Sequence, residues 1–135
     1  MKEFGIALLC LCSVAYAAGS GVQKWRATST TSISVTGDVG LSGNALYFAN
    51  GKSLNLKQVA GDQKRGRYVY QVVSADNPVL MNGNTLCGPR APAHLFVERN
   101  RNQLNIAVFD NDQAPALDFD VFMPAGACAT YHYER

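Results

Sequence analysis

Two pairs of aspartates have a spacing that could support acid/base chemistry. Asp118 and Asp120 stand two positions apart among alternating apolar residues, and Asp110 and Asp112 stand two positions apart shortly before them. Side chains two positions apart on a strand share a face about 7 Å from each other, which suits the two carboxylates of a glycoside hydrolase. Solvent-facing alternation explains Asp118 and Asp120 without any catalysis, and we favour that interpretation.

Asp110 and Asp112 could also belong to a metal site. Asp110-Asn111-Asp112 begins like a calcium-binding loop, but Ala114 and Pro115 stand where the next ligand and the glycine are needed. The sequence therefore predicts no metal site and no cofactor.

His94 and His132 are the histidines of the chain, and either could act as an acid or a base. Catalysis also needs a nucleophile or an orienting carboxylate within hydrogen-bond reach, which no local motif supplies. The sequence contains no Gly-x-Ser-x-Gly elbow, no His-Glu-x-x-His and no phosphate-binding glycine loop. We expect a protein that is not an enzyme. The alternative is a small envelope hydrolase that combines Asp118 or Asp120 with one of the histidines.

The start of the chain has the pattern of a secretion signal. The apolar run 4–14 follows Lys2 and ends in Ala15-Tyr16-Ala17, with small residues at the −3 and −1 positions of a cleavage site. That run is shorter than the roughly 20 residues that span a bilayer as a helix. We expect residues 1–17 to be a cleaved signal peptide and residues 18–135 to be a single periplasmic or secreted domain without a membrane anchor.

Export also determines which cysteines remain in the mature protein and whether they are oxidised. Cys10 and Cys12 lie in the signal, so Cys87 and Cys128 remain after cleavage. Two cysteines in an oxidising compartment are most simply joined to each other, and the sequence predicts this disulfide.

Apolar and polar residues alternate along most of the mature chain. The pattern predicts strands over 31–36, 45–48, 53–59, 67–73, 94–98, 104–108, 117–123 and 128–134, with short segments at 79–81 and 85–88. The predicted fold is all-β, a small antiparallel β-barrel or a two-sheet sandwich of eight or nine strands. Trp25 near the start, with Tyr131 and Tyr133 near the end, leads us to expect neighbouring terminal strands and hence closure.

Asn50-Gly51 is the strongest turn signal in the sequence. Both residues tolerate a positive φ, and alternating segments flank them, so we expect a hairpin at this position.

Parts of the chain resemble known exported proteins. The stretches Thr36-Gly37-Asp38-Val39, 45–54 and Cys128-Ala129-Thr130-Tyr131 resemble small uncharacterised exported proteins of Gram-negative bacteria. In size, signal, strand number and single disulfide the chain is also similar to the periplasmic inhibitors of C-type lysozyme, which implies a small antiparallel barrel. The chain lacks their Ser-Gly-Ala-Arg-Tyr-like segment and early cysteine, so no inhibitory residue carries over.

The charge pattern narrows the class of partner. The net charge is +2, and the basic clusters around 64–67 and 90–101 come without a row of exposed aromatic residues to stack bases. We therefore expect a monomer that binds no nucleic acid and whose partner is a protein or an envelope polymer.

A cross-linked β scaffold without catalytic motifs favours a non-enzymatic binding protein, such as an inhibitor or immunity factor acting at the cell envelope. An envelope assembly or adhesion subunit is a further alternative. The predicted binding residues are Pro89, Arg90, Pro92 and His94 in and beside the loop 88–93. Two prolines stiffen this loop next to Cys87, and a pre-organised loop loses less entropy on binding.

Overall fold

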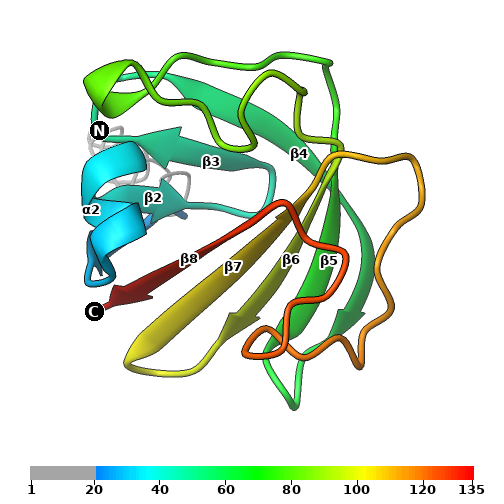
Figure 1. Ribbon diagram of the computed structural model, residues 1–135. Helices are drawn as coiled ribbons and strands as arrows, with labels where there is room; N and C mark the ends of the chain where they lie inside the picture. Colours follow the sequence, from blue (N-terminus) through cyan, green and yellow to red (C-terminus); the bar gives the residue numbers. More distant parts are fainter. Residues whose placement is uncertain (1–20) are drawn as a thin grey trace, which may run out of the picture.

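The chain forms a closed antiparallel β-barrel (Figure 1). The computed structural model describes residues 21–135, so the predicted signal peptide lies outside the described residues. The strands are β1 (Gln23–Ala27), β2 (Val39–Leu41), β3 (Ala45–Phe48), β4 (Ser53–Asp62), β5 (Arg67–Val72), β6 (His94–Arg99), β7 (Gln103–Phe109) and β8 (Ala129–Glu134).

The strands follow one another around the barrel in chain order, and β8 pairs with β1 through Arg26 opposite Glu134 and Ala27 opposite Tyr133. The all-β prediction is confirmed. Of the two predicted architectures, the structure is the barrel and not the sandwich, and the terminal strands are neighbours as expected. The disulfide between Cys87 and Cys128 is also present, with 5.5 Å between the two Cα atoms.

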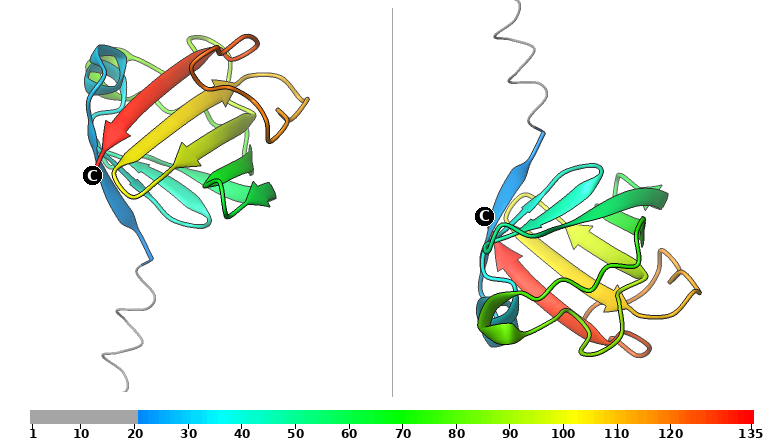
Figure 2. Two further views of the ribbon diagram at one scale, coloured as in Figure 1. Left: turned by 90° about the horizontal axis from the view of Figure 1, so that it is seen from below. Right: turned by 90° about the horizontal axis from the view of Figure 1, so that it is seen from above.

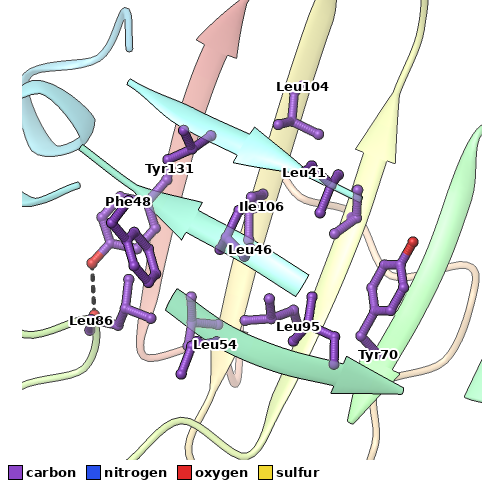
Figure 3. Packing of buried hydrophobic residues seen from close by; sticks show 14 of the residues in the cluster. Leu41, Leu46, Phe48, Leu54, Tyr70, Leu86, Leu95, Leu104, Ile106 and Tyr131 are labelled. Atoms are coloured by element: carbon purple, nitrogen blue, oxygen red, sulfur yellow. Dashed lines mark hydrogen bonds between the residues drawn. The ribbon is translucent and has the colours of Figure 1, made fainter. Parts of the chain in front are cut away.

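Side chains fill the interior of the barrel. Alternate residues of each strand point inward, and in a barrel of this size they occupy the space between the strands. Figure 3 shows part of this core. Its largest fully buried members include Trp25, Leu46, Leu54, Leu95, Leu104, Ile106, Tyr131 and Tyr133. A binding surface therefore has to be sought on the outside of the barrel.

The two ends of the barrel differ. The hairpin end is formed by the turns 42–44, 63–66 and 100–102, together with Gln23 and Arg135. The opposite end, the loop end, carries α2 (Thr30–Val35), the turn 49–52 and the connections 73–93 and 110–128, and η1 (Met81–Gly83) lies in the first of these connections. Figure 2 shows α2 beside the connection 73–93, while the connection 110–128 runs along the side of the strands.

The segment 31–36, predicted as a strand, is a helix. Ser29 caps its N-terminus because its side-chain oxygen accepts a hydrogen bond from the Ser32 backbone at 3.1 Å. Ile33 is exposed while Ser32 is buried, the reverse of the alternation expected for a strand. The Ser32 hydroxyl accepts a hydrogen bond from the His132 backbone at 2.8 Å, so capping and docking on β8 outweigh the strand preference of Ile33 and Val35.

The segment 117–123, also predicted as a strand, is a loop that covers a second apolar cluster. On the outer face of β5–β7 lie buried apolar residues, namely Val69, Phe96, Ala107 and Phe109, and Val121 of the loop packs against them. Leu117 and Phe119 add partly buried cover. Apolar and polar residues alternate in this segment as they do in a strand. The Asp120 side chain, however, accepts a hydrogen bond from the Phe122 backbone at 2.9 Å, which forms a local turn in place of hydrogen bonds to a neighbouring strand.

The short segment 85–88 was expected to be an edge strand and is irregular. The Thr85 hydroxyl donates to the Gly88 carbonyl at 2.6 Å, and the Tyr131 hydroxyl donates to the Leu86 carbonyl at 2.7 Å. Side-chain hydroxyl groups thus form the hydrogen bonds that these backbone carbonyls would otherwise form with a neighbouring strand.

The hairpin at Asn50-Gly51 is confirmed, with one difference. Gly51 has a φ of 90°, but Asn50 does not adopt a positive φ. Asn50 instead accepts a hydrogen bond from the Lys52 backbone at 3.1 Å and donates one to the Val79 carbonyl at 3.0 Å. Within residues 21–135, no helix has the length and apolar character needed to cross a bilayer.

Candidate binding groove on β1–β3

The predicted loop 88–93 exposes only part of the predicted binding set. Pro89 and Arg90 are exposed, and Arg90 Nε lies 3.6 Å from a carboxylate oxygen of Asp110. Pro92 and His94 are buried, and His94 Nδ1 lies 3.1 Å from the Asn111 carbonyl oxygen. A partner that binds the outside of this loop would therefore contact Pro89 and Arg90, whereas Pro92 and His94 pack beneath the loop and are not accessible.

The aspartates do not form the arrangement that acid/base chemistry on a strand would need. Asp118 and Asp120 are exposed in the irregular segment 110–128 and do not share a strand face. Asp110 is paired with Arg90, and Asp112 is exposed. No group of three His, Cys, Asp or Glu side chains in residues 21–135 is placed to hold a metal ion.

His132 belongs to a polar row that crosses the outer face of the barrel. Arg67, Glu98, Asn105 and His132 are successive cross-strand neighbours on β5–β8. Arg67 Nε lies 3.0 Å from Glu98, and His132 Nδ1 lies 2.7 Å from Asn105. The Phe122 ring stacks on His132 with 5.8 Å between centroids, and burial lowers the pKa of His132 from its ordinary value. These contacts hold the loop 110–128 against β8.

A groove of about 620 Å³ lies on the outer face of β1–β3. Lys24, Gly40 and Tyr47 are direct cross-strand neighbours on this face, so the groove has a residue without a side chain at its centre. A Cβ atom at position 40 would stand only 2.9 Å from Cγ1 of Val22 and 3.7 Å from Cβ of Tyr47. The glycine therefore creates the hollow that Val22 and Tyr47 border.

The groove is apolar with a basic margin. Its apolar lining includes Val22, Trp25, Val39, Tyr47, Phe48 and Ala49. Val22 and Tyr47 are 38% and 42% exposed, and neighbouring exposed apolar side chains of this kind mark interaction sites. Its volume falls in the range of small-molecule binding sites, about 300–1,000 Å³.

Lys24, Arg26, Arg135 and Asp38 supply the charged margin of the groove. Arg26 pairs with Glu134 at 3.4 Å, and Asp38 accepts a hydrogen bond from the Ala27 backbone at 2.9 Å. Lys24 forms no ion pair with any residue in 21–135, and the Arg135 guanidinium lies 5.0 Å from the centre of the Trp25 ring. Two cations thus remain available at the edge of an apolar surface.

Trp25 forms part of the groove wall and also part of the barrel core. Its indole Nε1 is buried and has no hydrogen-bond partner in the described part of the chain. A buried donor without a partner costs free energy, so a ligand that brings a hydrogen-bond acceptor to this N–H would remove that cost.

Sequence reasoning missed this groove. The alternation of Lys24, Trp25 and Arg26 does separate an outer basic face from an inner aromatic one. The partner strand β2 has only three residues, all of them buried, and carries no alternation that would reveal its pairing with β1. Comparison with protein-family models, with curated proteins and with solved structures finds no match to this chain.

Proposed function

We propose that this chain is an exported, non-enzymatic binding protein whose groove on β1–β3 takes an amphiphilic anion of the cell envelope. The observation that carries the proposal is the apolar groove of about 620 Å³ with Lys24 and Arg135 at its margin. Val22, Tyr47 and Ala49 offer contact to an acyl or aromatic body, while the cations suit a carboxylate or phosphate head group.

The closed barrel favours a binding protein over an assembly subunit. Strand addition needs an unpaired sheet edge, and closure pairs every strand on both sides. The hydrolase alternative relied on Asp118 and Asp120 sharing a strand face, and this premise is lost because the two lie in an exposed loop.

Titration with dodecanoate tests the proposal. Trp25 is the only tryptophan of the chain and lines the groove, so its fluorescence reports on occupancy. Tyr47→Ser removes an apolar wall and should weaken dodecanoate binding about tenfold, equivalent to about 1.4 kcal/mol. Val73→Ser, at an exposed valine outside the groove, should leave binding unchanged.

A charge variant tests the orientation of the ligand. Lys24→Gln should weaken the binding of dodecanoate but not that of neutral dodecanol, because only the former has a charged head group. Equal affinity of Tyr47→Ser and the parent protein for dodecanoate would overturn the proposal, as would the absence of any dodecanoate binding by the parent.

A further inference from the structure

Basic side chains gather at the hairpin end of the barrel, which the small net charge of the chain conceals. The hairpin end and the adjoining strand ends carry basic residues, namely Lys24, Lys64, Arg65, Arg99, Arg101 and Arg135. Three carboxylates of these strand ends are ion-paired: Asp62 with Arg65 at 3.6 Å, Glu98 with Arg67 at 3.0 Å and Glu134 with Arg26 at 3.4 Å. The hairpin end is therefore strongly cationic.

Of the remaining aspartates, Asp76, Asp110 and Asp112 lie in the connections of the loop end, where Arg90 is paired with Asp110. Asp38 lies in the margin of the groove with Lys24, Arg26 and Arg135, and Asp118 and Asp120 lie in the part of the connection 110–128 that packs on the outer face of β5–β7. The cations gathered at the hairpin end attract an approaching polyanion toward that end.

Arg99 is held in place at the mouth of the barrel. Its Nη1 donates to the Gln23 side-chain oxygen at 2.9 Å, and its guanidinium lies 5.3 Å from the centre of the Tyr68 ring. Within residues 21–135, this hydrogen bond is the only one that its side chain donates, and it forms no ion pair. A positioned guanidinium with spare donors can bind an anion with little loss of side-chain entropy.

Shallow hollows surround Arg99 and share their lining. A hollow of about 260 Å³ contains Arg99, Arg101 and Arg135, and one of about 180 Å³ contains Arg99 with Tyr70. A third, of about 450 Å³, contains Arg135 and Glu134 but not Arg99. Amide side chains border them, namely Gln23, Gln63, Asn100, Asn102 and Gln103. Guanidinium and amide groups thus line neighbouring hollows of the hairpin end.

We propose that the hairpin end binds an acidic polysaccharide, with Arg99 and Arg101 contacting its sulfate or carboxylate groups and the amides contacting its hydroxyl groups. The aromatic rings at this end argue against a nucleic acid. The guanidinium of Arg99 lies over one face of the Tyr68 ring, and that of Arg135 lies over one face of the buried Trp25 ring. The exposed Phe122 ring, which lines a hollow with Arg65 and Arg99, has one face stacked on His132. None of these rings has both faces open, whereas the stacking of successive bases needs a series of open rings. The inference does not depend on the groove of β1–β3, because Arg99 and Arg101 do not line it.

Binding to three polymers tests this inference. Dextran sulfate and polygalacturonate present sulfate and carboxylate groups respectively, and neutral dextran is the uncharged reference. We expect binding to at least one of the two acidic polymers, weakened by added salt, and none to dextran. The preferred polymer identifies the anionic group.

Two pairs of variants make the test specific. The double variant Arg99→Gln/Arg101→Gln should weaken binding of the acidic polymer by about tenfold or more, whereas Lys52→Gln/Lys57→Gln, with the same change in net charge away from the hairpin end, should weaken it less than about twofold. Loss of the Arg99 contacts could reduce the stability of the double variant. Arg101→Gln alone changes only an exposed side chain, so this single variant tests binding in a folded protein.

Three outcomes would overturn the inference. The first is equal weakening by both double variants, which would indicate unspecific attraction. The second is the absence of binding to either acidic polymer, and the third is tighter binding of a single-stranded oligonucleotide of equal charge. Tyr47→Ser should leave polysaccharide binding unchanged, so failure here and failure of the groove proposal are separate results.

Discussion

Two tyrosine hydroxyl groups are buried in the barrel, and each forms a hydrogen bond across it. Tyr131 donates to the Leu86 carbonyl at 2.7 Å (Figure 3), and the Tyr133 hydroxyl lies 2.9 Å from the Thr36 hydroxyl. Burial raises the pKa of Tyr131 to about 12. Burial also raises the pKa of Tyr133, and the hydrogen bond between Tyr133 and Thr36 opposes this in part. Both side chains therefore remain protonated donors at physiological pH.

The first prediction concerns Tyr131. Tyr131→Phe leaves the buried Leu86 carbonyl without this partner, so the free energy of unfolding should fall by about 1–3 kcal/mol. Tyr47→Phe, at an exposed hydroxyl, should change it by less than about 0.5 kcal/mol. Urea unfolding of both variants measures the difference. Equal losses would show that the bond to Leu86 contributes nothing.

The second prediction concerns the pH dependence of stability. Burial lowers the pKa of folded His132 below its ordinary value of 6.5, so the unfolded chain takes up a proton first as the pH falls. The stability due to neutral His132 is present above pH 6.5 and is lost as the pH falls through the lower pKa of the folded state. His132→Gln should flatten the unfolding free energy between about pH 7 and pH 5.5, a range that brackets the ordinary histidine pKa. An unchanged slope would contradict this assignment.

At the scale of residues, sequence reasoning recognised Cys87 and Cys128 but not the groove. The two cysteines outside the predicted signal peptide leave one pairing, whereas the position of Gly40 between Lys24 and Tyr47 depends on the register of β1–β3. Register is a property of three strands together, and no local pattern in β2 specifies it.

At the scale of elements, the period-two alternation predicted β3 to β8 correctly and failed at 31–36, at 117–123 and at the short segment 85–88. At 31–36 the Ser29 cap and the docking of Ser32 on β8 stabilise a helix. At 117–123 the apolar side chains do pack, but against the outer face of another part of the barrel. Alternation reports that one side of a segment is buried, and it does not report which surface buries it.

The third prediction concerns the hairpin 49–52. Gly51 has a φ of 90° with open space around its Cα, so Gly51→Val meets no clash but forces a β-branched residue into left-handed backbone. The unfolding free energy should fall by about 1–2 kcal/mol. Gly43→Ala, at a glycine that also lies in open space but lacks a positive φ, should have little effect. Equal melting temperatures of the two variants would contradict this account of the turn.

At the scale of the whole molecule, closure and one covalent link hold the ends of a small fold together. The Cys87–Cys128 disulfide closes a segment of 41 residues and ties the connection 73–93 to the start of β8. The sequence favoured closure without deciding between barrel and sandwich, because aromatic residues lie near both ends of the predicted domain. It predicted the link, because that domain has a single pair of cysteines. It did not predict the gathering of cations at the hairpin end, since the net charge is a sum over the whole chain.

The fourth prediction follows from the link. In the chain-entropy model, cross-linking a segment of this length stabilises the fold by about 4 kcal/mol. Cys87→Ser/Cys128→Ser, which leaves no free thiol in the domain, should lower the unfolding free energy by about 2–5 kcal/mol. A loss below about 1 kcal/mol would mean that the barrel core holds the fold without the disulfide.

The most direct test of the binding proposal is to map dodecanoate on the mature protein by backbone amide chemical shifts. We expect the largest shifts at Lys24, Gly40 and Tyr47, which line the groove, and none at Arg90 in the loop 88–93. Arg90→Glu should leave the map unchanged. Shifts concentrated around Arg90, or no shifts in β1–β3 at saturating dodecanoate, would contradict the proposal that the groove is the functional site.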